Sequence, residues 1–519
     1  MQAKKIVNVI NFIRAEDPRI AQDVLYDTFK NQVALCKSYP LPYTFLLQYD
    51  AMVRPEYAKL LLENDDPNME IGVWIELAQE QVERVGLRWD GRPGYKWDWH
   101  VHPDMLMGYP IPARKLLIDE LMNRFHSIFG YYPRSVGSWL LDSYSIAYMA
   151  ECYHVEAFCI CKEQFGTDGY TLWGGYYNQG YYPCKKNMLS PAQTADEQIN
   201  VPVFRMLGPD PIYQYDVGMD GQYNHSACQH VMTIEPCWEC GQSPTWVDWY
   251  LHSTFEEEAL GLAYTQTGQE NPFTWATFGK SLRMQMEKIY AGHTAGIWEV
   301  LSLGDTGRWF KSTYATTPAT AMTALTDWKK EGRQSVWYNS KRYRANWYAE
   351  NGHLLLRDLF LFDEQYAERY WDEHVTGTHA VYDTLPLVDG YRWSGNGTRC
   401  GLHPVSADQG RPLSARLCGT ERLDEHTLKL LMEIDDQPAS CTFYEDHLAL
   451  RLPPSIDLCL AYHATEDTVI EALDGNRVCY RHNGFSYGLR CNGRILPKEN
   501  GCRLCGENGL LEIYFFAER

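Results

Sequence analysis

The chain has 519 residues, of which 45% are hydrophobic and 14% aromatic, and it carries a formal net charge of −20. This length predicts two or three domains, the acidity argues against a nucleic-acid partner, and the short apolar runs exclude a helical membrane span. Sixteen cysteines without a recognisable signal peptide favour free thiols and a cytoplasmic location.

Strand-like and helix-like segments alternate over residues 1–330, which predicts an α/β fold with a (β/α)7-8 barrel. One helix is expected over 111–129, where Leu117, Leu121 and Phe125 are spaced by four, and another over 319–328. Two insertions, 86–110 and 165–202, are rich in Trp, Tyr and Gly. We expect strands at 6–13, 43–50, 70–77, 135–142, 155–161, 231–235, 260–265 and 296–303.

Short alternating strands separated by turns follow over residues 331–519. A hairpin is predicted from 342–350 to 353–361, because Asn351-Gly352 is a favoured two-residue turn. The C-terminal domain is therefore predicted to be a β-sandwich packed against the barrel.

Six acids stand at or just beyond the ends of predicted strands: Asp50, Glu76, Asp142, Glu235, Glu270 and Asp305. The strands of a parallel barrel end on one common face, and catalytic residues collect there. Hydrolysis of a glycoside needs two carboxyl groups on either side of the glycosidic oxygen, which this face could supply. The alternative for such acids is structural, and for Asp142 it is the N-cap of the next helix.

Other side chains near these strand ends could bind a sugar. Flat rings in the insertions offer stacking surfaces, and polar groups beside the acids offer hydrogen bonds, although packing under long loops would also explain the rings. Besides Asp50 and Glu76, the predicted substrate-binding residues are Trp97, Trp99, His100, Trp173, Gln269 and Arg308.

Two cysteine pairs, Cys237 with Cys240 and Cys502 with Cys505, have the spacing of a zinc knuckle. They could form one four-sulfur site only if the end of the chain met the barrel, and two separate reduced pairs are the favoured interpretation. We therefore predict no metal site.

Three stretches resemble known families. The segment 137–144, which contains Trp139, Leu140 and Asp142, resembles the Trp-Leu-x-Glu stretch of family 57 glycoside hydrolases. Glu70-Ile71-Gly72 resembles a segment of polysaccharide deacetylases, which share a seven-stranded barrel, but the metal-binding histidines of that family are missing. Segments 207–216, 268–271 and 304–309 make most of the chain similar to a group of candidate glycosidases from gut bacteria.

The family 57 resemblance implies that Asp142 is the nucleophile and that Asp305, on a late strand, is the acid, with Glu270 and Glu235 as the other candidates. The predicted function is a metal-independent glycoside hydrolase that cleaves a small oligosaccharide or glycoside at the barrel mouth, without a cofactor. The alternative is a non-catalytic carbohydrate-binding protein on a deacetylase-like barrel, and a metal-dependent deacetylase is a third possibility. A carbohydrate is the expected partner, no membrane is involved, and a homo-oligomer stays open.

Overall fold

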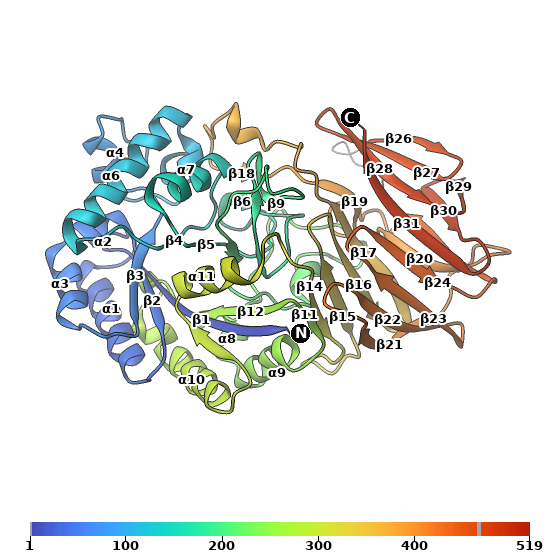
Figure 1. Cartoon of the computed structure of the whole chain (residues 1–519), viewed down its shortest axis with the longest axis horizontal. Coiled ribbons are helices and arrows are strands. Elements are labelled where there is room, and N and C mark those ends of the chain that lie inside the picture. Colours follow the sequence, from blue (N-terminus) through green and yellow to red (C-terminus); the bar gives the residue numbers. More distant parts are fainter. Residues whose placement is uncertain (1–2, 464–468, 519) are drawn as a thin grey trace.

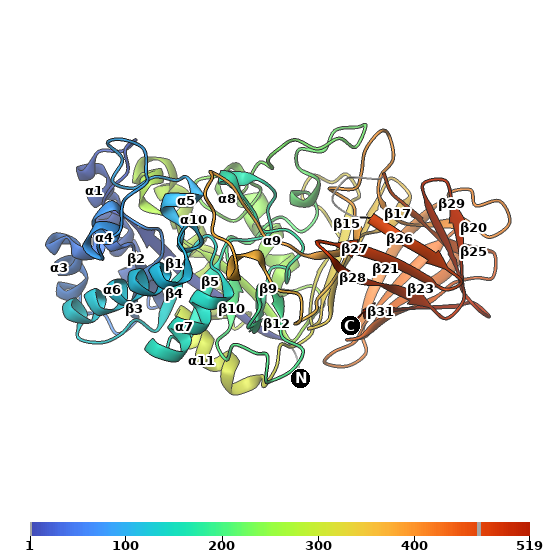
Figure 2. The same ribbon diagram turned by 90° about the horizontal axis from the view of Figure 1, so that it is seen from above.

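A curled, mostly parallel sheet forms the N-terminal half of the protein and antiparallel sheets form the rest, as the computed structural model shows (Figure 1). The structure describes residues 3–463 and 469–518. Figure 2 shows the two halves side by side along the long axis of the molecule. In the described residues, no helix combines the length and the apolar character that crossing a bilayer requires.

The parallel sheet brings together strands from the first 301 residues in the order β12-β1-β2-β3-β4-β5-β10, with β7 antiparallel at the edge and β13 beside β1. The bounds are β1 Lys4–Ile13, β2 Tyr43–Leu47, β3 Met69–Trp74, β4 Ser135–Gly137, β5 Ala157–Ile160, β7 Gly180–Tyr181, β10 Val203–Arg205, β12 Leu262–Thr267 and β13 Glu299–Leu301. Every residue of β1 after Lys4 and Lys5 is buried, as expected for a central parallel strand covered on both faces.

The expected closed barrel is wrong, because the sheet stays open. Edge strands β12 and β7 do not pair with each other in the described part of the chain. Aromatic side chains fill the gap instead: Phe204 of β10 and Tyr264 of β12 have ring centroids 5.1 Å apart. The opening therefore carries packed side chains where a closed barrel would have backbone hydrogen bonds.

Helices surround this sheet in Figure 1. The predicted helix 111–129 is confirmed, and it ends at Gly130, whose φ of 80° allows a left-handed cap. The bounds are α1 Gln22–Lys37, α2 Tyr49–Val53, α3 Pro55–Glu63, α4 Gln79–Arg84, α5 Val101–Asp104, α6 Ile111–Phe129, α7 Ser143–Tyr153, α8 Glu239–Gln242, α9 Pro244–Phe255, α10 Trp275–Thr294 and α11 Leu303–Thr313.

Two sequence predictions in this half are wrong. Residues 231–235 form only an isolated bridge from Thr233 to Pro209, and the sixth parallel strand is β10 instead. The helix expected over 319–328 is the buried strand β14 (Thr320–Ala324), which pairs with β15 (Gln334–Asn339). Its Ala and Met residues favour a helix locally, but strand pairing on both sides overrides that weak preference.

Two antiparallel sheets share one apolar core in the C-terminal half. The predicted hairpin is confirmed, with β16 and β17 joined at Asn351-Gly352. The first sheet contains β11 Ala259–Leu260, β14, β15, β16 Tyr343–Glu350, β17 His353–Leu361, β19 Leu385–Asp389, β20 Gly401–Ser406, β25 Ile456–Ala461, β29 Arg494–Lys498 and β30 Gly501–Cys505. The second contains β21 Ala415–Arg422, β22 Leu428–Ile434, β23 Gln437–Phe443, β24 His447–Arg451, β26 Val469–Asp474, β27 Arg477–His482, β28 Phe485–Cys491 and β31 Leu510–Ala517.

The first antiparallel sheet also recruits residues before position 330, since β11 and β14 belong to it. Two short pairs tie the insertion 165–202 together and to the later chain: β6 (Tyr170–Thr171) with β18 (Ala380–Val381), and β8 (Pro183–Cys184) with β9 (Asn187–Pro191). The division at residue 330 and the two-layer sandwich stay predictions.

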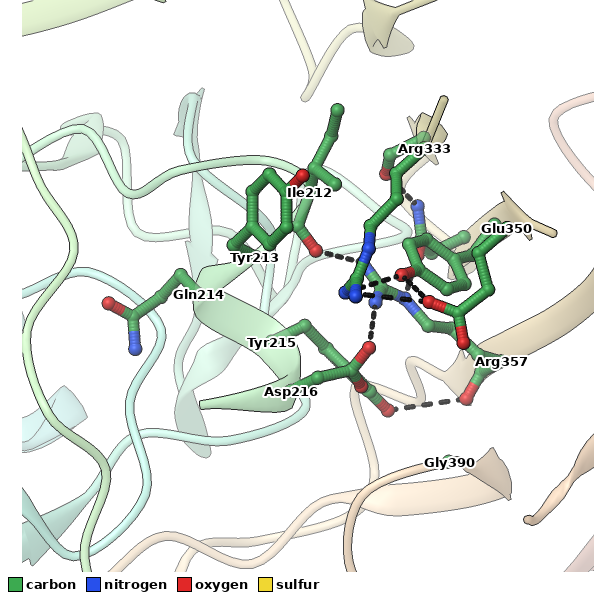
Figure 3. A network of polar contacts seen from close by, with 12 residues as sticks. Ile212, Tyr213, Gln214, Tyr215, Asp216, Arg333, Glu350, Arg357 and Gly390 are labelled. Carbon is green, nitrogen blue, oxygen red and sulfur yellow. Dashed lines mark hydrogen bonds and ion pairs between the residues drawn. The ribbon is translucent and has the colours of Figure 1, made fainter. Parts of the chain in front are cut away.

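A largely buried ion-pair network joins the two halves (Figure 3). Arg357 of β17 donates to the Asp216 carboxylate at 2.9 Å and to the Ile212 carbonyl at 3.2 Å. Arg399 donates to the same carboxylate at 2.7 Å. Burial acts to raise the pKa of Asp216, but the two guanidinium groups outweigh it and hold that pKa below its ordinary value. The loop 212–216 is thereby anchored on the antiparallel sheet.

Candidate active site

Arg14 connects two of the predicted acids at the carboxyl ends of the parallel strands. It follows β1 directly, and its Nη2 donates to Glu76 Oε2 at 2.8 Å and to Glu270 Oε2 at 2.6 Å. Glu76 lies two residues beyond β3, and Glu270 lies three residues beyond β12. All three side chains are almost fully buried, so the strand ends form one compact charged site.

The position of Glu270 depends on a close approach between β12 and β1. Gly268 has a φ of 123°, and a Cβ there would stand 1.7 Å from the Ile10 carbonyl oxygen, so only glycine fits. Beyond Glu270, the Asn271 side chain accepts from the Arg14 backbone N at 3.0 Å and donates to the Arg14 carbonyl at 2.8 Å. Glu270 is therefore held between two fixed backbone segments.

Glu235 is brought beside Glu270 by an amide on α10. Gln285 donates to the carbonyl oxygens of Ile234 at 2.8 Å and Gly241 at 2.7 Å, and it accepts from the Thr267 hydroxyl at 2.5 Å. Gln269 completes the link, since its Nε2 lies 3.4 Å from Glu235 Oε1. The loop that carries Glu235 is therefore tied to the end of β12.

Burial raises the pKa values of both carboxyl groups, to about 7 for Glu235 and to about 8 for Glu270. For Glu270, the Arg14 charge lowers the pKa, and the charges of Glu76 and Glu235 raise it again. Glu235 is 5% exposed and Glu270 is 8% exposed. Because the Glu235 charge disfavours ionisation of Glu270, the two carboxyls can hold one proton between them near neutral pH.

A buried lysine lies near Glu235. Lys162, two residues beyond β5, is 1% exposed, and among the described residues its Nζ donates only to the Glu163 carbonyl, at 3.2 Å. Burial lowers the pKa of Lys162, while its charge lowers the pKa of Glu235. Lys162 therefore favours the ionised form of Glu235.

Glu76 is held by three donors, which are Arg14, Trp74 Nε1 at 2.6 Å and Trp139 Nε1 at 2.9 Å. Burial raises the pKa of Glu76, and these donors oppose the rise. Asp104 accepts from Trp97 Nε1 at 3.0 Å, and burial followed by the Glu76 charge raises its pKa well above the ordinary value. Glu76 is thus a fixed hydrogen-bond acceptor just beyond the end of β3.

The insertion 86–110 covers this charged site with rings. Trp97 is buried, and the Arg14 guanidinium lies 3.9 Å from its ring centroid. Trp99 is half-buried against Arg92, at 3.9 Å, and Arg19, at 4.9 Å. The half-buried His100 has its Nδ1 3.7 Å from Asp98. Of these rings, Trp99 and His100 keep surface open to a ligand.

Asp142 does not join this site. It accepts from the Ser145 backbone N at 2.9 Å and from the Ser145 hydroxyl at 2.7 Å, which makes it the N-cap of α7. The Arg114 guanidinium lies 3.1 Å away, and the Asp142 side chain is fully buried. This geometry fits the alternative in which Asp142 has a structural role as the N-cap of a helix.

Asp305 and Arg308 lie at the opposite end of the strands. Asp305 pairs with Arg308 and, at 3.6 Å, with Arg134, which immediately precedes β4. The neighbouring Gly304 N donates to Glu70, the second residue of β3. Asp305 is therefore near the amino ends of β3 and β4, whereas Asp142 follows the carboxyl end of β4.

Asp50 and Trp173, two further predicted site residues, make contacts that hold parts of the fold together. Asp50 accepts from the backbone N of Ala15 at 2.9 Å and of Ala51 at 2.7 Å, and burial raises its pKa to about 7. Trp173 is buried and donates to Asp389 Oδ2 at 3.2 Å, between the parallel sheet and the first antiparallel sheet. Neither is among the contacts of Glu235 or Glu270.

The chain resembles known proteins in structure and not in sequence. No family model and no curated protein sequence matches the chain. A candidate glycoside hydrolase/deacetylase from Parabacteroides distasonis is 14% identical over 75% of this chain and 92% of its own, with a TM-score of 0.55. The two chains share a fold.

Two other solved structures are more distant. A candidate polysaccharide deacetylase from Mycobacterium smegmatis has 11% identity over 60% of this chain and 92% of its own, with a TM-score of 0.37. A family 57 branching enzyme from Thermococcus kodakaraensis has 9% identity over 60% of this chain and 72% of its own, with a TM-score of 0.29. At these values neither likeness supports a statement about this chain.

Sequence reasoning missed Arg14, Lys162 and Trp139 as parts of the site. Arg14 and Lys162 stand just beyond two predicted strands, at 6–13 and 155–161. Their place at strand ends could therefore have identified them as site residues. A cation beside two buried acids is needed to limit the cost of burying their charge.

The cysteine pairs stay apart. All sixteen cysteines lie in the described residues, where none forms a disulfide. Cys237 lies beside Glu235 and Glu270, and Cys502 lies in β30 of the antiparallel sheet, near Cys459 and Cys491. Across residues 3–463 and 469–518, no three His, Cys, Asp or Glu side chains are grouped to hold a metal ion.

Proposed function

We propose that the protein is a glycoside hydrolase whose two working carboxyl groups are Glu235 and Glu270. The observation that carries this proposal is the buried pair at the carboxyl ends of the parallel strands, with pKa values raised to about 7 and about 8. Glycoside cleavage uses one protonated and one ionised carboxyl group. The pair meets this requirement near neutral pH.

Glu270 serves as the proton donor, because it has the higher pKa of the two. It gives its proton to the glycosidic oxygen while the bond from that oxygen to the anomeric carbon breaks. The Glu235 carboxylate, favoured by Lys162, either attacks the anomeric carbon or removes a proton from an attacking water. Arg14 stabilises the negative charge left on Glu270 after the transfer.

The substrate we propose is a small oligosaccharide or glycoside, bound at the open edge of the site near Trp99 and His100. The fold shared with a candidate glycoside hydrolase/deacetylase supports a carbohydrate substrate. The free cysteines support a reducing, cytoplasmic location, and the sequence resemblance of residues 137–144 supports a distant relation to family 57 enzymes. Turnover of a panel of nitrophenyl glycosides by the purified protein tests the activity, and no turnover of any member would contradict it.

The pH dependence of kcat/KM should be a narrow bell. Glu235 must be ionised, so activity falls as the pH drops through about 7, and Glu270 must be protonated, so activity falls as the pH rises through about 8. Stopped assays from pH 5 to 10 on the best glycoside measure both limbs. In Lys162→Met the acidic limb should move to higher pH, because the charge that favours ionised Glu235 is gone. If the acidic limb does not move, Lys162 does not favour the ionised form of Glu235.

A further inference from the structure

Trp238 is an exposed ring next to the proposed catalytic pair. Its side chain is 38% exposed, although it is one of the largest apolar residues of the chain. The indole Nε1 makes no hydrogen bond to any described residue. Its ring meets the half-buried ring of Phe273 edge to face, with centroids 5.7 Å apart and an angle of 65°. The two rings form an aromatic corner open to solvent.

Both rings are carried by the segments that carry the two acids. The Trp238 backbone N donates to the Glu235 carbonyl at 3.1 Å. Phe273 closes the turn Asn271–Phe273, which begins directly after Glu270. The aromatic corner is therefore fixed relative to both proposed catalytic carboxyl groups.

The turn after Glu270 holds an unfavourable backbone conformation. Thr274 has φ 63° and ψ 142°, which a β-branched residue rarely adopts. Such a conformation is kept only where the surroundings impose it, commonly at ligand-binding sites. Here it joins the turn that ends at Phe273 to helix α10, which begins at Trp275.

Packing alone does not account for Trp238. A tryptophan with a purely structural role normally buries its ring and satisfies its N–H, as Trp246 and Trp97 do in this protein. A flat, rigid and exposed ring is suited to stacking on the C–H face of a sugar, because little side-chain entropy is lost on binding.

We propose that Trp238, supported by Phe273, is a stacking surface for a second, neutral sugar ring next to the one that is cleaved. This inference rests on the proposed function and narrows its substrate to oligosaccharides of neutral hexoses or pentoses. The ring adjoining the scissile bond reaches the carboxyl pair, and the next ring lies on Trp238.

The test compares nitrophenyl monosaccharides with nitrophenyl trisaccharides of the same sugar, for whichever sugar the protein cleaves. Trp238→Ala should lower kcat/KM on the trisaccharide about tenfold, the usual scale for truncating an aromatic contact, and leave the monosaccharide within about twofold. Trp238→Phe should restore most of the trisaccharide activity. Trp371→Ala is the matched control, because Trp371 is 37% exposed but lies on another segment.

Equal losses on the two substrates would overturn the stacking role. If the wild type cleaves nothing, calorimetric titration with unlabelled gluco-, galacto-, manno- and xylo-oligosaccharides separates the two proposals. Binding that is lost in Trp238→Ala but kept in Trp371→Ala supports the stacking surface while the hydrolase proposal fails. Binding that Trp238→Ala leaves unchanged, or no binding of any oligosaccharide, overturns the stacking surface. Urea unfolding midpoints within error of the wild type confirm that each variant is folded.

Discussion

Replacing Glu270 with Gln should lower kcat by about 10²–10⁴-fold on a glycoside with a poor leaving group, the range expected for loss of a general acid. The amide keeps the size of the side chain but cannot donate a proton of suitable acidity to the glycosidic oxygen. Steady-state kinetics at the wild-type pH optimum measure the effect. KM should change little, since the lost interaction acts in the transition state.

Asp305→Asn is the matched control for Glu270→Gln. Asp305 is the acid that the family 57 resemblance favours, and the structure places it in a partly exposed ion pair at the amino ends of the strands. Its replacement should leave kcat within about twofold, as for an exposed surface pair. A large loss in Asp305→Asn together with an active Glu270→Gln would reverse the assignment.

Replacing Asp142 with Ala should lower the free energy of unfolding by about 3–5 kcal/mol, the cost of leaving a buried charge without its partner. Arg114 would lose that partner, and α7 would lose its N-cap. Urea unfolding followed by circular dichroism measures the change. Asp142→Ser, which retains a capping oxygen, should lose less than the Ala variant.

The catalytic rate of folded Asp142→Ala is expected to match the wild type, because this side chain does not contact the proposed pair. Activity per folded molecule is obtained by scaling kcat to the native fraction at the assay temperature. An unchanged unfolding midpoint with kcat lowered a hundredfold or more would indicate that Asp142 takes part in catalysis.

The sequence predicted the parallel strands better than the roles of the acids beside them. Strand ends at Leu47, Trp74 and Thr267 lie close to the predicted positions, because long buried runs of β-branched and aromatic residues are a strong signal. An acid between a strand and a helix fits catalysis and capping equally well. Only the contact with Ser145 decides between the two for Asp142.

Asp305 was misplaced for a different reason. The strand before it, β13, aligns with residues 6–8 of β1 and ends at the level of Asn8, well before the carboxyl end of β1. Strand length and register come from tertiary pairing, which a single sequence does not reveal. The strand β14 escaped prediction likewise, because its burial between β11 and β15 is a property of the assembled sheet.

The assignment of Glu270 and Glu235 is tested most directly by the dependence of kcat on the leaving group in a series of aryl glycosides. A dinitrophenolate departs without a proton, whereas a simple phenol needs one. Glu270→Gln should therefore keep most of its activity on dinitrophenyl glycosides and lose progressively more as the leaving group becomes more basic, while Glu235→Gln should lose activity on the whole series. A uniform loss in Glu270→Gln, or full activity in Glu235→Gln, would contradict the proposed roles.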